Sequence, residues 1–384
     1  MKNFPSVFLL SIFSFILVTI EFLPIGLLGY IKDIYKISSN YAGLLISIPG
    51  LVAAIFALLV SNNLSLNNNK NLIILISIFL STSTLFMVVF DSFFVLMISY
   101  LVIGVCVGVF WSISLTIVSQ LVHKEKVPFA TSILFTGAAL SMVIGIPFST
   151  LISYTYGWKY SLLLLSLLSF INTYCLYRFL PNNLSRVRCE GECYIKILST
   201  PESLVSNLLV LLIFLSQFMT YTYFSDLVAT QPYLEIDLSS LLLIFGLSGV
   251  LFNFIFGLIV NKFRFTAVIL LFLGLMISFI FLNISGSQHI FVMLIVLWGG
   301  VWGALPPTLR TWQRTFKYGD SQYTSSLFVS INQIATALGA FVGGVIINDY
   351  NMEILYFSSS FIVFISIILL IYQYKNRDYL ANLT

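Results

Sequence analysis

The sequence has 384 residues, of which 59% are hydrophobic and only 8% are charged, with a net charge of +4. Soluble domains have about 25% charged residues, so this composition excludes an ordinary water-soluble protein and predicts an integral membrane protein. The small positive charge does not indicate nucleic-acid binding, because the basic residues lie in short segments between apolar stretches, where they set membrane topology.

Twelve long apolar stretches follow one another along the chain, and about 20 such residues in a helix cross the hydrocarbon core of a bilayer. The polar stretch 181–203 is the longest connection, and we predict that it is a cytoplasmic linker between two six-helix bundles, 1–180 and 204–384. The sequence thus predicts an all-α membrane protein with spans at 6–30, 41–60, 72–90, 94–118, 129–152, 160–180, 204–225, 239–260, 266–285, 289–309, 322–347 and 354–374.

The distribution of basic residues predicts the orientation of these spans. If both termini lie in the cytoplasm, only Lys32, Lys36 and Lys159 of the 18 Lys and Arg residues fall on the outer side. Basic residues concentrate on the cytoplasmic side of membrane proteins. The alternation therefore supports the span count as well as the placement of both termini in the cytoplasm.

The first span contains Glu21, the only acidic residue within any predicted span. A carboxylate in hydrocarbon costs about 3 kcal/mol, so an intramembrane acid is by default a functional hypothesis. Burial favours its neutral form and contact with water favours its charged form, which suits a proton carrier. The alternative is that Glu21 only bonds to a neighbouring helix. Pro24 cannot donate to the carbonyl of Ile20 and is predicted to open the helix locally.

Small residues recur at matching places in the two halves. Glycine pairs spaced by four residues occur in spans four and ten, about 195 residues apart, as expected of an internally duplicated transporter. Such glycines let helices approach closely, so we assign conformational roles to Gly104, Gly108, Gly145, Gly299 and Gly303. The corresponding residue for Gly145 in span eleven is Gly339.

Aromatic and uncharged polar side chains within the spans are the candidate substrate contacts. Flat rings with hydrogen-bonding groups commonly hold sugars and nucleosides, and polar groups in hydrocarbon face the protein interior or a wet cavity. We select six of them: Trp111, Thr136, Gln217, Tyr221, Trp302 and Asn332. Packing rings and hydrogen bonds between helices are the competing interpretation for each residue.

Other kinds of chemistry lack the residues that they require. Cys106 and Cys175 lie in spans, Cys189 and Cys193 lie in the polar linker, and His is nearly absent, so no metal site is predicted. A Walker-type loop and a nucleophile triad are also absent. We therefore predict neither an enzyme nor a cofactor, and no intramembrane Arg or Lys that would clamp an anionic substrate.

Several segments resemble the major facilitator superfamily, specifically its drug:proton antiporter branch and the group of sugar-efflux (arabinose export) and purine-ribonucleoside-efflux transporters. The first half carries the segments Glu21–Leu28, Val109–Ser112 and Thr136–Pro147, and the second half carries Trp298–Trp312. The resemblance implies two pseudo-symmetric bundles in a bacterial inner membrane, working by proton antiport and alternating access. It also implies a proton-coupling or substrate-contacting role for Glu21 and a conformational role for Pro147.

The chain departs from this family's pattern at two places. The loop after span two usually carries an Asp and two basic residues, and here it reads Asn68, Asn69 and Lys70. Span four usually begins with an Arg, where this chain has Tyr100. The first change weakens a latch between conformations, and the second removes a positive neighbour of the coupling acid.

The interpretation that follows is an exporter of small neutral polar solutes, sugars or nucleosides, driven by proton entry. A multidrug exporter and an uncoupled facilitator remain as alternatives of the same fold, and a non-transporting membrane sensor as one of a different class. The expected partners are the lipid bilayer, a small-molecule substrate and protons, with no nucleic acid, and a monomer is expected.

Overall fold

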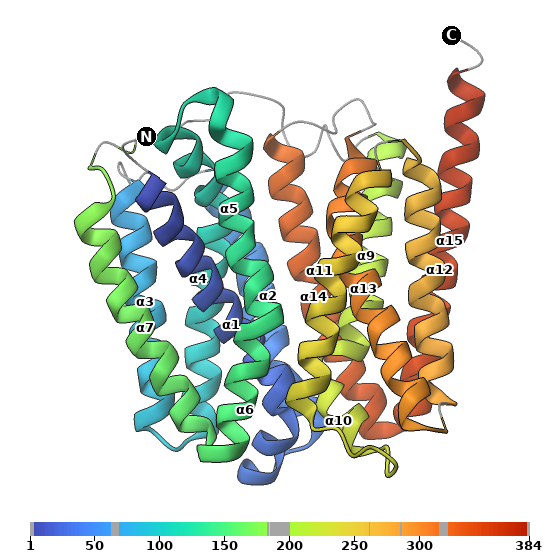
Figure 1. Ribbon diagram of the computed structural model, residues 1–384, viewed down its shortest axis with the longest axis horizontal. Coiled ribbons are helices and arrows are strands. Elements are labelled where there is room, and N and C mark those ends of the chain that lie inside the picture. Colours follow the sequence, from blue (N-terminus) through green and yellow to red (C-terminus); the bar gives the residue numbers. More distant parts are fainter. Residues whose placement is uncertain are drawn as a thin grey trace. The chain divides into compact units, whose positions relative to one another are not determined.

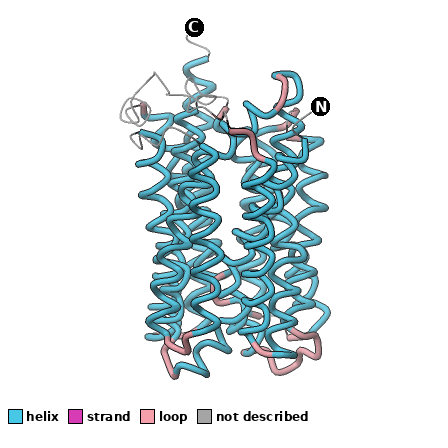
Figure 2. The backbone as a smooth tube through the Cα atoms, turned by 90° about the vertical axis from the view of Figure 1, so that its left-hand side faces the viewer, coloured by secondary structure: helices cyan, strands magenta, loops and turns pink. Residues whose placement is uncertain are grey.

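The computed structural model describes residues 4–62, 69–182, 184, 200–260, 262–284, 286–314 and 322–381, without the side chains of 61, 62, 128, 283, 322–326 and 376–381. Helices account for nearly all of this part of the chain, and no strand occurs in it (Figures 1 and 2). Twelve of the described helical segments are long and apolar enough to cross a membrane. This confirms the predicted all-α membrane fold.

Contacts between residues divide the chain into two compact units. The first, here called the N-terminal bundle, comprises Met1–Ile37 and Leu44–Glu190, and the second, the C-terminal bundle, comprises Ser38–Gly43 and Gly191–Thr384. Most of the predicted linker 181–203, including Cys189 and Cys193, lies outside the described residues. Of the other two cysteines, Cys106 is buried and Cys175 is half-buried, and both are free thiols.

The N-terminal bundle contains the helices of the first six spans, coloured blue to green in Figure 1. The fifth span is assembled from three consecutive pieces, of which the middle one, η2, is a π-helical turn. The elements are α1 (Phe4–Tyr35), α2 (Ser39–Asn62, whose first residues belong to the C-terminal bundle), α3 (Asn69–Val89), α4 (Phe93–Leu121), η1 (Lys124–Lys126), α5 (Val127–Leu140), η2 (Ser141–Gly145), α6 (Ile146–Tyr156) and α7 (Trp158–Phe179).

The C-terminal bundle contains the remaining helices, coloured yellow-green to red in Figure 1. Its first span is shorter than predicted, because the helix ends at Tyr221 and a new short helix begins at Phe224. Tyr223, predicted inside span seven, therefore lies in the break. The elements are α9 (Pro201–Tyr221), α10 (Phe224–Ala229), α11 (Leu238–Ile259), α12 (Arg264–Asn283), α13 (Gln288–Gln313), α14 (Gln322–Asp349) and α15 (Met352–Ala381).

The same pattern of helix pairs occurs inside each bundle. In the N-terminal bundle α1 packs on α5 and α7, and α3 packs on α4 and α7. In the C-terminal bundle the matching pairs are α9 with α14 and α15, and α12 with α13 and α15. This correspondence is what a duplicated six-helix unit produces.

Glycines make the closest of these contacts in both bundles. A Cβ atom on Gly104 would lie 2.6 Å from the carbonyl oxygen of Pro49, and one on Gly108 would overlap the backbone of Ala53, both in α2. In α13, Gly299 and Gly303 are pressed in the same way against the backbone of α11 at Phe245 and Gly249. Without side chains at these points, backbone can meet backbone, which is the main source of helix association in a membrane.

Candidate functional site

Glu21 lies inside α1, where only 4% of its surface is exposed. Its helix neighbours Ile20, Phe22 and Leu23 are buried as well, so the carboxyl group sits in an apolar stretch of the N-terminal bundle. Among the Asp, Glu, His, Lys and Arg side chains that the structure describes, only Glu21 and Lys70 are buried. The protonation of a buried carboxyl group depends on whether its surroundings are apolar or wet, so it can exchange a proton when those surroundings change.

Pro24 lies three residues after Glu21 but does not break α1, which runs without interruption from Phe4 to Tyr35. A proline inside a helix removes one N–H, and the carbonyl four residues earlier loses its donor. That carbonyl belongs to Ile20. α1 thus continues through Pro24 without the predicted local opening, although the Ile20 carbonyl lacks its usual helical donor.

Tyr100 of α4 satisfies that acceptor. Its hydroxyl donates to the carbonyl oxygen of Ile20 over 3.3 Å, and only 3% of the residue's surface is exposed. Tyr100 was singled out in the sequence only as a departure from a family pattern. The signal that identifies its role is the spacing of Ile20 and Pro24, combined with the fold that brings α4 beside α1.

On another side, α1 meets the fifth span through small residues. Gly26 lies against the Thr150 side chain, and Gly145, at the end of the π-helical turn η2, lies against Thr19. Gly137 lies against the backbone of Ser11 about two turns away. Gly145 thus lies in the seam between the fifth span and the helix that carries Glu21, with the buried Pro147 two residues later. π-helical turns frequently occur at functional sites.

Trp111 and Thr136 occupy the same bundle as Glu21, on α4 and α5. The Trp111 ring is half-buried, stacks on Phe135 with ring centroids 5.4 Å apart, and meets Phe110 edge-on at 5.1 Å. Thr136 is exposed, and its hydroxyl donates to the carbonyl of Ser132 in its own helix. Trp111 therefore offers part of an aromatic face, while Thr136 is the neighbouring polar group.

Trp302 and Asn332 are half-buried in the C-terminal bundle. The Trp302 ring is held edge-on by Phe214 at 5.1 Å and by Phe218 at 5.5 Å. The Asn332 amide oxygen accepts from Thr336 over 3.5 Å. Both tryptophans lie near the paired glycines of their own helix, Trp111 three residues after Gly108 and Trp302 one residue before Gly303.

Gln217 and Tyr221 lie elsewhere, in a closed cluster around Trp298. The Gln217 side chain accepts from the Trp298 indole N–H over 2.7 Å, and both residues are fully buried. Tyr221, Phe245, Phe224 and Phe279 surround the same indole, with ring centroids 5.2 to 6.0 Å away. Gln217 and Tyr221 therefore lie together in a closed cluster, whereas Trp302 and Asn332 are partly exposed.

Lys70 is also buried, at the start of α3. Its ammonium group donates to the carbonyl of Leu180 over 2.6 Å and to the Asn182 side chain over 2.7 Å. The Asn69 backbone N–H donates to the Leu184 carbonyl nearby. Lys70 therefore caps the C-terminal end of α7, where its positive charge also interacts favourably with the negative end of the helix dipole. Asn68 lies outside the described residues.

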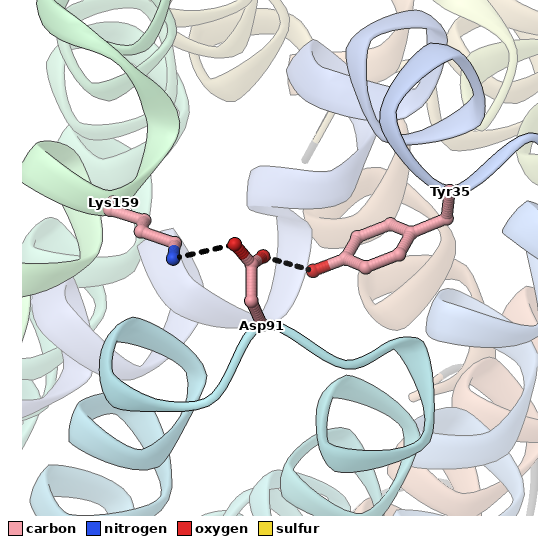
Figure 3. A network of polar contacts seen from close by, with 3 residues as sticks. All are labelled: Tyr35, Asp91 and Lys159. Carbon is pink, nitrogen blue, oxygen red and sulfur yellow. Dashed lines mark hydrogen bonds and ion pairs between the residues drawn. The ribbon is translucent and has the colours of Figure 1, made fainter.

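At the opposite ends of these helices, three residues form the network in Figure 3. Asp91, between α3 and α4, accepts from the Tyr35 hydroxyl over 3.3 Å and pairs with the Lys159 ammonium over 3.0 Å. The orientation predicted from the sequence puts all three on the outer side. The network thus ties α1, α7 and the α3–α4 connection together at one end of the N-terminal bundle.

Residues for metal chemistry do not come together in the described part of the chain. No group of three His, Cys, Asp or Glu side chains lies close enough to hold a metal ion there. The candidate site therefore consists of one buried carboxyl group, the hydroxyl and backbone groups around it, and half-buried aromatic rings.

Comparison with protein families and curated proteins gives consistent results. Residues 7–316 match the family model described as Major Facilitator Superfamily. A purine ribonucleoside efflux pump, NepI of Shigella sonnei, is 23% identical over 352 residues, covering 91% of this chain and 89% of the pump. The protein of Pseudomonas aeruginosa named transcription regulatory protein OpdE is 25% identical over 387 residues, covering 98% and 95%.

Solved structures show the same fold. The nucleoside transporter NupG matches with a TM-score of 0.77 and 10% identity, covering 97% of this chain and 100% of that one. A bacterial homologue of the human lysosomal transporter Spinster matches with a TM-score of 0.74 and 12% identity, covering 98% and 97%. At such low sequence identities, these matches show a shared architecture alone.

Proposed function

Since the chain belongs to the major facilitator superfamily and is therefore a multi-pass transporter of small molecules rather than an enzyme, we propose that it exports neutral polar solutes, nucleosides or sugars, by proton antiport. The observation that carries this proposal is the burial of Glu21 in α1. Relatives that match most of the chain are named purine ribonucleoside efflux pumps. We rank nucleosides ahead of sugars for this reason.

In the proposed cycle Glu21 carries the proton. Protonation from the outer side neutralises the carboxyl group and lowers the cost of enclosing it in hydrocarbon. The bundles then reorient, and Glu21 releases its proton to the cytoplasm, which restores the charge and resets the transporter. Each cycle moves protons inward as solute leaves, so the pH gradient supplies the driving force.

Solute contact is proposed for the half-buried rings and their polar neighbours. Trp111 and Trp302 offer aromatic faces on which a nucleobase or the apolar face of a sugar stacks, with Thr136 and Asn332 as hydrogen-bonding groups. Gln217 and Tyr221 are fully buried around Trp298, so their contribution requires a conformation in which that cluster opens. The absence of charge among these six side chains favours a neutral solute.

Reorientation is proposed to use the tightly packed seams that hold Gly104, Gly108, Gly145, Gly299 and Gly303, together with Pro24 and Pro147. We retain the sequence-based bundles 1–180 and 204–384, the cytoplasmic placement of both termini, and a monomer as parts of the proposal. Inner-membrane localisation agrees with the twelve apolar helices.

The decisive experiment replaces Glu21 with Gln, which keeps size and polarity but cannot carry a proton. Purified protein in vesicles is tested for transport of a labelled purine nucleoside and a labelled sugar, with and without a pH gradient. We expect Glu21→Gln to abolish gradient-driven export while solute exchange without a gradient persists. The matched control is Glu235→Gln, which makes the same change at an exposed position.

Full gradient-driven export by Glu21→Gln would refute proton carriage by Glu21. Transport of lipophilic cations with no transport of nucleosides or sugars would instead identify a multidrug exporter. Either result leaves the family and the fold untouched.

An uncoupled facilitator of the same fold is the second candidate. The observation that favours it is Tyr100, which donates to backbone and brings no positive charge to the coupling acid. Equal initial rates with and without a pH gradient, in wild type and in Glu21→Gln alike, would establish facilitation.

A further inference from the structure

We infer that Tyr100 is a positioning residue for Glu21, acting through the carbonyl of Ile20 that Pro24 leaves without its helical donor. This inference rests on the proposed function of Glu21, since positioning matters only if the carboxyl group takes part in transport. It extends that function by naming the group that fixes the geometry of the acid.

The Ile20 carbonyl lacks its usual hydrogen-bond donor within α1. In a regular helix the carbonyl of residue 20 accepts from the N–H of residue 24, and here residue 24 is a proline without an N–H. A carbonyl left unpaired in the apolar interior of a membrane protein destabilises the folded state. Some donor must therefore come from outside α1, or the helix distorts.

Tyr100 of α4 supplies a donor to this carbonyl. The Tyr100 hydroxyl lies 3.3 Å from the Ile20 carbonyl oxygen, although the two residues are 80 positions apart in the sequence. Tyr100 is itself almost fully buried, so its hydroxyl needs an acceptor as much as the carbonyl needs a donor. The bond meets both needs at once and joins α4 to α1 at the proline.

The hydrogen bond from Tyr100 is made directly beside the acid. Ile20 immediately precedes Glu21, so anchoring its carbonyl fixes the backbone from which the carboxyl group projects. One turn further along α4, Gly104 packs on the backbone of Pro49 in α2, which keeps α4 from shifting. Tyr100 therefore anchors the turn of α1 in which Pro24 removes a backbone hydrogen bond.

The test is a double-mutant cycle between Tyr100 and Pro24. Tyr100→Phe removes only the hydroxyl, and Pro24→Ala returns an N–H that can bond to the Ile20 carbonyl. In the wild-type background we expect Tyr100→Phe to lower the rate of gradient-driven solute export about five-fold, the size of one net hydrogen bond. The solute KM and the rate of gradient-free exchange should stay unchanged, which a general folding defect would not allow.

In the Pro24→Ala background the same substitution should change export less than about two-fold, because the carbonyl no longer depends on Tyr100. The matched control is Tyr356→Phe, which removes a hydroxyl from an equally buried ring whose oxygen has no hydrogen-bond partner among the described residues. We expect this control to export at the wild-type rate.

The cycle is also measured by thermal unfolding of the purified variants, which does not depend on transport. Tyr100→Phe is expected to lower the unfolding temperature by about 2 °C in the wild-type background and to have no effect after Pro24→Ala. Equal effects of Tyr100→Phe in both backgrounds, in export and in unfolding, would overturn the inference. If Glu21→Gln exports normally while the unfolding cycle shows coupling, the function proposed for Glu21 fails and the Tyr100 bond stands.

Discussion

The two bundles share a packing scheme but differ in the polar groups that they bury. In both, paired glycines press one helix against the backbone of the next, and the same pairs of helices meet. The N-terminal bundle encloses Glu21 with a tyrosine hydroxyl beside it. The C-terminal bundle encloses Gln217 bonded to an indole. The two bundles thus share the packing of their helices and differ in the polar side chains that they bury.

The largest effect is expected where this shared packing is tightest. Gly108→Val and Gly303→Val each push a side chain into a neighbouring backbone and should each cost about 3 kcal/mol, which is expected to lower the yield of folded protein several-fold. Gly257→Val is the control, because nothing lies within 4 Å of the added Cβ. The yield of monodisperse protein measures the outcome. Tolerance of one substitution and not the other would show that the two seams are not equivalent.

A smaller effect should separate the polar anchors of the two bundles. Lys70 caps α7 with a charge, whereas Gln373 joins the Trp312 indole to the Glu202 carbonyl with neutral groups. Because charge-assisted hydrogen bonds are about twice as strong as neutral ones, we expect Lys70→Met to cost about 2 kcal/mol and Gln373→Leu about 1 kcal/mol.

Thermal unfolding of both variants measures this difference, with Lys124→Met as the control at an exposed lysine. An equal or larger loss for Gln373→Leu would mean that the charge of Lys70 adds nothing to the capping of α7.

The smallest effect concerns Asp237, which caps α11 by accepting from the backbone and side chain of Ser240. Partial burial acts to raise the pKa of Asp237, but the hydrogen bonds from Ser240 outweigh it and hold the pKa below the ordinary value of 3.8. A lowered pKa means that the stabilisation is complete above pH 3.8 and fades as the pH falls through the folded value.

We therefore expect Asp237→Ala to cost about 1 kcal/mol at neutral pH, and the gap to wild type to narrow below pH 3.8. Unfolding temperatures measured over this pH range test the expectation, with Glu235→Ala as the control at an exposed neighbouring acid. A gap that stays constant with pH would assign the effect to packing rather than to the carboxylate.

The sequence was sufficient to predict the spans, because stretches as apolar as these have no other stable place than a bilayer. It was also sufficient to find Glu21, since a lone acid in such a stretch is conspicuous. The break at Tyr223 was not predictable, because Phe218 to Phe224 contains neither Gly nor Pro. Helix breaks without Gly or Pro depend on tertiary contacts, here the bond from the Tyr223 hydroxyl to the Ala340 carbonyl.

The candidate site was predicted less completely than the fold. The partner of Gln217 is Trp298, 81 residues away, and the acceptor for Tyr100 is the Ile20 carbonyl, 80 residues away. Such pairs depend on how far one helix is rotated and shifted against another, which the apolar pattern within a single span does not determine. The pattern showed that these side chains needed partners and left the partners unidentified.

The π-helical turn η2 has a consequence for how related sequences are compared. A π-helical turn holds one residue more than an α-helical turn, so the residues after Gly145 are rotated by about 100° relative to an uninterrupted helix. A relative without this turn would have one residue fewer between Ser141 and Gly145 and still present the same faces on both sides. Single-residue gaps in alignments of the fifth span should therefore be placed within Ser141–Gly145, because a gap elsewhere would turn lipid-facing residues toward α1.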